Sequence, residues 1–231
     1  ARYYASALQS LEQSGNTGWK ARLLNNMGML KYMTGQLEEA YPLLDKASRV
    51  AGQCGYVRIQ TNALISLGDL LTDLNDLDSA FACYDQALTQ ASNLGHSLYI
   101  FYASLGEARI KRLRGDVHQA VKDLRHVELS QARLGSFERA FFVLELGHCM
   151  LEDGKLDIAA QYYMESANLF GEGGNQTEEQ VARFWQDVLQ WFVSSISGID
   201  HFSKKIPPQR EWRSPTPLMI NAGRAAMWLK K

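Results

Sequence analysis

Small residues stand at fixed intervals inside the apolar stretches of this chain, and glycine or asparagine separates the stretches. Positions that recur in this way are called a column here, and in each of the three columns below the successive members are 40, 40 and 39 residues apart. Inside the stretches, one column is Gly28, Gly68, Ala108 and Gly147, and another is Ala40, Ala80, Ala120 and Ala159. The separating column is Gly35, Asn75, Gly115 and Gly154. Because independent columns lose one residue at the same place, the chain is a tandem repeat.

Each repeat is predicted to form two helices joined by a tight turn. Glycine and asparagine tolerate the left-handed backbone conformation that ends a helix, which explains the separating column. A further column is predicted to end the second helix in the same way, namely Gly15, Gly55, Gly95, Gly135 and Gly174. Glycine inside a helix costs about 1 kcal/mol relative to alanine. The inner small residues are therefore predicted where two helices cross closely.

The spacing inside each repeat resembles that of the tetratricopeptide repeat family. A small residue is followed twelve positions later by alanine, and then by a large residue on the packing side, namely Leu44, Tyr84, Leu124 and Tyr163. Three positions further stand Ala47, Ala87, Val127 and Ser166. The resemblance covers roughly residues 1–175 and implies an all-α, right-handed superhelix of helix-turn-helix repeats. The chain departs from the family in its longer period and in its early tryptophan position, which holds Leu24, Leu64, Ser104 and Leu144.

The longer period is similar to that of helical-repeat domains in large bacterial regulators. These are LuxR-like activators of the maltose-regulon type and regulators that carry a bacterial transcriptional activator domain. The segment Gly68-Asp69-Leu70-Leu71 carries this likeness. Arrays with this period also occur in kinesin light chains and polarity adaptors. The resemblance implies a non-catalytic binding module of a cytoplasmic, bacterial signalling or transcription regulator.

The columns also predict how the whole chain is organised. A half repeat at 1–16 precedes repeats near 17–56, 57–96, 97–136 and 137–175. Apolar residues at helical spacing predict a capping helix over 176–197, with Thr177 and Gln180 as its capping box. Four of the five prolines lie in 198–217, which favours a loop or linker, and 218–231 is predicted to form a last helix. Because the chain begins inside a repeat and without methionine, we expect it to be a piece of a longer protein.

The aromatic residues of the capping helix have two interpretations. Trp185 and Trp191 either cover the core of the last repeat or form a patch for a partner. Their place among apolar residues at helical spacing favours the first interpretation.

Charge is distributed unevenly along the chain. Its net charge is −1, but residues 201–231 hold seven cationic side chains and one anionic side chain, so the first 200 residues carry −7. An acidic repeat body repels phosphate, which argues against direct binding of nucleic acid. The basic tail is either solvated, in contact with an acidic surface, or a connection to a further module. No run approaches the roughly 18 consecutive apolar residues of a membrane helix, so no membrane contact is predicted.

The sequence lacks familiar catalytic and metal-binding motifs. It has no HExxH, GxSxG or P-loop, so we expect no enzyme activity, cofactor or metal. The scattered histidines are interpreted as surface or satisfied core residues, and Cys54, Cys83 and Cys149 as small buried residues. Asp69 and Asp73 lie four apart on one helix face. They could serve acid–base chemistry, but a solvated acidic stripe is the favoured interpretation.

The candidate binding surface is a concave groove lined by the first helix of each repeat. Most candidates stand six and three residues before the inner small column and one residue after it, whereas Arg112 stands four after it, and Phe142 and Glu145 stand five and two before it. They are Arg22, Asn25, Met29, Asn62, Ile65, Asp69, Tyr102, Leu105, Arg109, Arg112, Phe142, Glu145 and His148. Asparagine pairs with backbone groups, arginine with carboxylates, and aromatic rings supply contact area, which suits a peptide or a polar small molecule. A solvated groove without a specific ligand is the alternative.

Two functions therefore stay open from the sequence. The leading one is an interaction scaffold that binds a protein or peptide segment, or other domains of its parent chain. The other is a small-molecule effector sensor in a transcriptional activator. A homodimer through the first helix or the aromatic last helix also stays open.

Overall fold

The computed structural model describes residues 7, 10–11, 14–130 and 135–194. Within these ranges the chain forms nine helices and no strand, so the predicted all-α class is confirmed. Most of the half repeat at 1–16, and all of the proline-rich segment and the last helix predicted for 198–231, lie outside the described residues.

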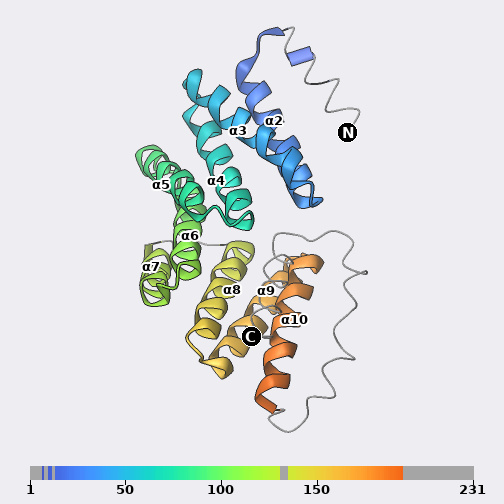
Figure 1. The fold of residues 1–231 in the computed structure, drawn as a ribbon, viewed down its shortest axis with the longest axis vertical. Coiled ribbons are helices and arrows are strands. Elements are labelled where there is room, and N and C mark those ends of the chain that lie inside the picture. The colour runs from blue at the N-terminus through green and yellow to red at the C-terminus, as the bar shows by residue number, and fades with distance from the viewer. Residues whose placement is uncertain (1–6, 8–9, 12–13, 131–134, 195–231) are drawn as a thin grey trace. The chain divides into compact units, whose positions relative to one another are not determined.

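The helices follow one another in pairs (Figure 1). Within each pair the connecting turn spans three residues. The pairs are α2 Thr17–Met33 with α3 Leu37–Gln53, α4 Val57–Asp73 with α5 Leu77–Leu94, α6 Ser97–Leu113 with α7 Val117–Ser130, and α8 Ser136–Glu152 with α9 Leu156–Glu172, followed by α10 Gln176–Ser194. Consecutive helices pack on one another from α2 to α5 and from α8 to α10, as in a helical-repeat superhelix.

The turns have the backbone conformation that the separating column predicts. The φ angles are 77° at Gly35, 64° at Asn75, 89° at Gly115 and 73° at Gly154, all in the left-handed region. The prediction for the column that ends the second helices is wrong at Gly135, whose φ is −67° and ψ 168°. Gly135 directly precedes α8 as its N-cap, so it begins a helix in extended conformation instead of ending one.

The inner small column lies where two helices cross closely, as predicted. A Cβ atom added to Gly28 would lie 2.6 Å from Leu44 Cδ2, and one added to Gly68 would lie 2.8 Å from Tyr84 Cε1. Gly147 stands in the same relation to Tyr163, also at 2.8 Å. These large partners are fully buried. The small and the large column are therefore two sides of one helix–helix contact.

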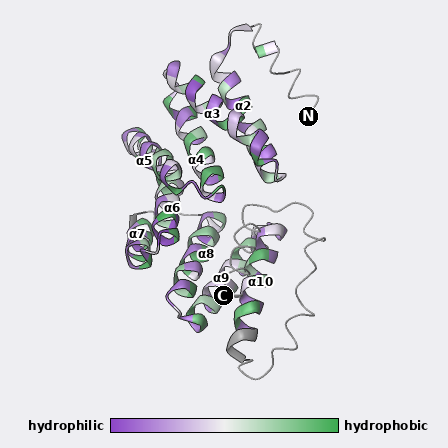
Figure 2. Ribbon diagram, viewed as in Figure 1, coloured by the Kyte–Doolittle hydropathy of each residue, from purple (hydrophilic) through white to green (hydrophobic). Residues whose placement is uncertain are grey.

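The chain divides into two compact units between Ile110 and Lys111. Each has its own apolar core. In the first unit Tyr32, Leu44 and Tyr84 belong to one cluster of α2 to α6. In the second unit α8, α9 and α10 share a cluster that includes Tyr163 and Trp185. Hydrophobic residues recur among hydrophilic ones along the helices that supply these cores (Figure 2).

Helix α10 covers the last repeat, which confirms the core interpretation of Trp185. Its side chain is 2% exposed and packs with Tyr163 and Phe184. The side chain of Trp191 lies outside the described residues. The helix begins at Gln176, so Thr177 lies within the first turn and not at the predicted N-cap position.

The three cysteines differ in exposure, and the prediction that all are buried is wrong. Cys149 is buried and Cys83 half-buried, but Cys54 is exposed because it ends α3 as its C-cap residue. Burial raises the pKa of the Cys83 thiol to about 11 and that of Cys149 further still. Since the thiolate is the reactive form, both thiols should react slowly.

We therefore expect one thiol to react rapidly when the native protein is treated with a disulfide reagent at pH 8. Mass spectrometry of the labelled peptides should locate it at Cys54. Cys54→Ser should remove the rapid phase, whereas Cys83→Ser should leave it unchanged. Rapid labelling of Cys149 would contradict the burial described for it.

Candidate ligand-binding pocket

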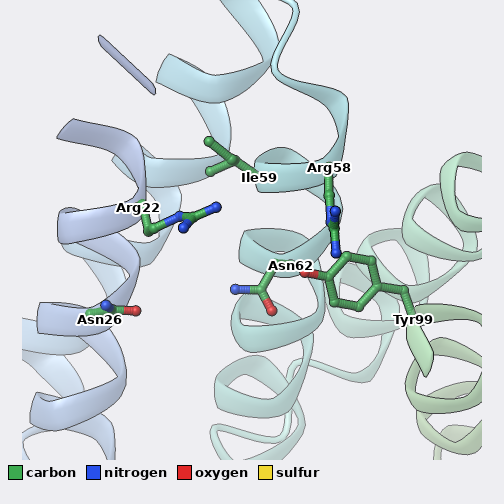
Figure 3. A pocket seen from close by; sticks show the side chains of 6 residues that line it. All are labelled: Arg22, Asn26, Arg58, Ile59, Asn62 and Tyr99. Carbon is green, nitrogen blue, oxygen red and sulfur yellow. The ribbon is translucent and has the colours of Figure 1, made fainter. Parts of the chain in front are cut away.

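An open pocket of about 380 Å³ lies on the first unit. Its lining comes from the first helices of three successive repeats, α2, α4 and α6 (Figure 3). The lining residues are Arg22, Asn26, Arg58, Ile59, Asn62 and Tyr99. Arg22, Asn26 and Arg58 are exposed, and the other three are half-buried.

Helical spacing brings these side chains together. Arg22 and Asn26 are four residues apart on α2, and Arg58 and Asn62 are four apart on α4, so each pair lies on one helix face. Each helix therefore offers one guanidinium and one amide to the pocket. In Figure 3 the side chains of Arg22, Asn26 and Asn62 project into the space between α2 and α4. Tyr99 approaches from α6 beside Arg58.

The lining is positively charged, because it holds two arginines and no carboxylate. The guanidinium of Arg22 lies 5.1 Å from the centre of the Trp19 ring, a cation–π contact. Arg58 Nη2 donates to His96 Nε2 at 3.1 Å. Among the described residues neither arginine forms an ion pair. An arginine without a carboxylate partner keeps N–H donors for an anionic ligand.

Two of the sequence candidates, Arg22 and Asn62, line this pocket. Asn25 and Ile65 instead are buried, with exposed fractions of 3% and 7%. Met29 and Tyr102 are half-buried and pack against apolar clusters of the first unit. Leu105 is also buried.

Asp69 and Arg109 do not line the pocket and belong to a polar network with Tyr84. Asp69 Oδ1 accepts a hydrogen bond from the Tyr84 hydroxyl at 2.7 Å and lies 3.7 Å from Arg109 Nη1. Burial raises the pKa of the Asp69 carboxyl, while Arg109 and Tyr84 act in the opposite direction. Burial also raises the pKa of Tyr84, and Asp69 adds to the effect, so the hydroxyl stays a neutral donor.

The expectation of a solvated acidic stripe is therefore wrong. Asp73 is 6% exposed and accepts a hydrogen bond of 2.6 Å from the Tyr32 hydroxyl. The two carboxylates tie α2 and α5 to α4, because Tyr32 lies on α2 and Tyr84 on α5. They stabilise the packing of the helices that carry the pocket.

The candidates of the second unit are buried. Phe142 is 3% exposed, Glu145 3%, Arg112 6% and His148 8%. Because the step to the last repeat is 39 residues, the position equivalent to Arg22 and Asn62 is Phe141, which is half-buried. His148 Nδ1 and the Tyr163 hydroxyl form a hydrogen bond of 2.8 Å, as expected of a satisfied core histidine.

Arg112 is the centre of a buried ion cluster. Its Nε donates to Glu145 Oε1 at 2.5 Å, and its Nη1 contacts Glu152. Burial alone would lower the pKa of Arg112, but the two carboxylates outweigh that effect and raise it. The arginine is therefore permanently charged, and its ion pairs with Glu145 and Glu152 occupy its N–H donors. It is therefore not available to a ligand.

Sequence reasoning missed Asn26, Arg58, Ile59 and Tyr99 in the pocket. A signal for part of this set was present. Ile59 and Tyr99 are 40 residues apart and form one column, nine residues before the inner small column. That column lies one helical turn before Asn62, on the same face.

These features define a helical-repeat protein with a positively charged pocket. Residues 61–94, most of α4 and all of α5, match the tetratricopeptide repeat family model. This match and the packing of paired helices both support the predicted tetratricopeptide-type repeat. Repeats of this family generally mediate protein–protein interactions. A comparison with curated proteins gave no match.

Two further features are absent from the described part of the chain. None of its helices is long and apolar enough to cross a membrane. No group of three or more histidine, cysteine, aspartate or glutamate side chains there could hold a metal ion.

Proposed function

We propose that the chain is a non-catalytic interaction scaffold that binds an extended acidic peptide segment in the pocket between α2, α4 and α6. One observation carries this proposal: two arginines and two asparagines, supplied by two successive first helices, surround one open space without any carboxylate. Guanidinium groups bind carboxylates by paired hydrogen bonds, and side-chain amides can bind both the N–H and the C=O of a peptide backbone.

The position of the pocket favours an extended peptide segment as its ligand over a compact ligand of the same charge. Its walls come from three helices in a row, with Tyr99 at one end and Arg22 at the other (Figure 3). An extended chain can contact successive helices in turn. Tyr99 and Trp19, which belong to one repeat column, offer aromatic surface for the side chains that flank the carboxylates.

The test is selection of random twelve-residue peptides displayed on phage against the whole chain. Selected peptides should be acidic, and their binding should disappear when each glutamate and aspartate is replaced by the corresponding amide. Calorimetry should show that Arg22→Gln and Arg58→Gln each weaken binding about tenfold, since a hydrogen-bonded charge contributes about 1.5–3 kcal/mol.

Arg49→Gln is the matched control. Arg49 is an exposed arginine of the same unit, but it lies on the second helix α3 and pairs with Asp45 at 2.7 Å. Its replacement should leave the affinity unchanged. Equal losses from all three variants would point to nonspecific charge attraction, and selected peptides without acidic residues would contradict the proposal.

A second candidate function is the binding of a small anionic effector. The pocket volume of about 380 Å³ falls within the range of about 300–1,000 Å³ that is typical of small-molecule sites. A metabolite ligand should raise the free energy of unfolding by about 2–3 kcal/mol at a hundredfold excess over its dissociation constant. Thermal-shift screening measures this effect, and Asn62→Ala should remove it.

In either role the chain would serve as a module of a larger regulator. We infer this setting, a bacterial signalling or transcription regulator, from the period and the segment that resemble LuxR-like activators and regulators with a bacterial transcriptional activator domain. The acidic segment would then come from a partner protein or from another domain of the parent chain.

A further inference from the structure

His96 holds one of the two arginines of the pocket. Arg58 Nη2 lies 3.1 Å from His96 Nε2. Arginine has N–H donors and no acceptor, so this bond requires a lone pair on Nε2. The contact therefore exists only while His96 Nε2 carries no proton.

The other side of the ring is held by α6, which begins immediately after His96. The imidazole is stacked on the Tyr99 ring at 4.0 Å with an interplanar angle of 12°. Its Nδ1 lies 3.4 Å from the Tyr99 backbone nitrogen, which is also a donor. The backbone N–H of His96 is fixed by Ala91 O at 3.0 Å.

Two donors thus face a ring that has one lone pair when neutral. A neutral imidazole can accept from Arg58 or from the Tyr99 backbone N–H, but not from both. Protonation of the ring therefore costs the hydrogen bond from Arg58, whereas the Tyr99 backbone N–H keeps its bond of 3.1 Å to the His96 carbonyl oxygen.

The charges around His96 also affect whether its ring is protonated. The described groups in contact with His96 are Arg58 from α4 and Tyr99 from α6, and no carboxylate pairs with it there. An imidazolium would add a third cation beside Arg58 and Arg22, which is unfavourable in the empty pocket. An anion in the pocket reverses this balance, because it attracts every cation around it.

We infer that His96 is a further binding residue of the pocket that acts in its protonated form. When an acidic segment binds Arg58, His96 takes up a proton from solvent, releases Arg58 and donates a hydrogen bond to the same anion. The inference rests on the proposed function, because it needs an anionic ligand. It adds a binding residue outside the pocket lining and makes affinity for acidic segments depend on pH. Linkage requires the converse as well, so binding at neutral pH should be accompanied by proton uptake.

The experiment measures binding of a tetraglutamate peptide to the whole chain by calorimetry at pH 8.0 and pH 5.5. Glutamate side chains stay largely ionised over this range, and imidazole is the side chain that titrates within it. We expect wild-type affinity to increase about tenfold at pH 5.5, because an imidazolium donates a charge-assisted hydrogen bond to the anion that the neutral ring cannot supply.

Two variants separate the inference from a structural role. His96→Gln keeps an acceptor for Arg58 but cannot take up a proton, so it should bind as the wild type does at pH 8.0 and gain nothing at pH 5.5. His96→Lys carries a permanent charge, so it should bind about tenfold more tightly than the wild type at pH 8.0. Circular dichroism confirms that both variants are folded.

The outcomes distinguish the two proposals. Binding of tetraglutamate that does not change with pH, or a pH effect that persists in His96→Gln, would overturn the role of His96 and leave the peptide pocket intact. Absence of binding at both pH values, in wild type and in His96→Lys, would contradict the acidic-segment proposal itself.

Discussion

Gly106→Ala should lower the free energy of unfolding of the first unit by about 1–3 kcal/mol, although alanine is the better helix former. A Cβ atom at position 106 would lie 2.5 Å from Tyr84 Cδ1. The Tyr84 ring has no room to move, because it is fully buried and its hydroxyl is bonded to Asp69. Urea denaturation followed by circular dichroism measures the loss.

Gly52→Ala is the control for this prediction. Gly52 is also a helical glycine, and its added Cβ would lie 2.5 Å from Gln60 Nε2, the end of a flexible side chain. Gln60 can move at the cost of its hydrogen bond of 3.0 Å from Gln90 Nε2, and the gain in helix propensity offsets part of that cost, so the variant should lose less stability than Gly106→Ala. If Gly106→Ala were equally well tolerated, the close contact with Tyr84 could not be the reason for glycine there.

Arg112→Met should have the largest effect, about 3–5 kcal/mol, because it leaves the buried carboxylate of Glu145 and the partly exposed carboxylate of Glu152 without their cation. Glu145 is 3% exposed and cannot be solvated instead. Arg183→Met is the control. Arg183 forms an ion pair at 2.8 Å with Glu179 on the surface of α10, and exposed pairs contribute only about 0.2–1 kcal/mol.

The loss caused by Arg112→Met should also depend on pH. Burial raises the pKa of Glu152, and Arg112 lowers it again. Without Arg112 only the effects of burial and of the nearby Glu145 remain, and both raise the pKa of Glu152, so the folded state binds a proton more tightly than the unfolded state. Stability then increases as pH falls. Denaturation at pH 7.5 and pH 5.0 should show a smaller loss at pH 5.0, and a larger one would contradict this account.

The fold could be predicted from the sequence because each structural requirement recurs at the equivalent position of several repeats. One glycine at a helix crossing is ambiguous, but Gly28, Gly68 and Gly147 at constant spacing, each with a large partner sixteen residues later, admit one explanation. Gly135 shows the limit of that reasoning. It stands in the right column, yet it begins α8 in an extended conformation.

The pocket was only partly predictable, because its face is rotated from the one assumed. Successive residues turn by 100° around a helix axis, so Asn26 lies 100° beyond Asn25. Asn25 is buried, whereas Asn26 is exposed and lines the pocket. The column of Ile59 and Tyr99 stands seven positions before that of Asn26, which brings it to nearly the same face. The repeat columns of the sequence give the period of the helices, but they do not show which face of each helix remains exposed after packing.

Buried charges could not have been assigned from the sequence. Arg112 pairs with Glu145 and Glu152, which are 33 and 40 residues away. Nothing in the local pattern distinguishes Arg112 from Arg109, which lies three residues earlier and contacts Asp69 instead. Which cation meets which carboxylate depends on how the helices turn when they pack.

Each wall of the pocket comes from a different repeat, and this arrangement affects how such a protein can evolve. Helix α4 contributes Arg58, Ile59 and Asn62, while α2 and α6 contribute the flanking walls. The apolar contacts that hold these helices together lie in other columns, such as that of Leu44 and Tyr84. A substitution can therefore alter one wall without disturbing the core. Selection can exchange the recognised segment stepwise, one helix at a time, while the architecture is inherited unchanged.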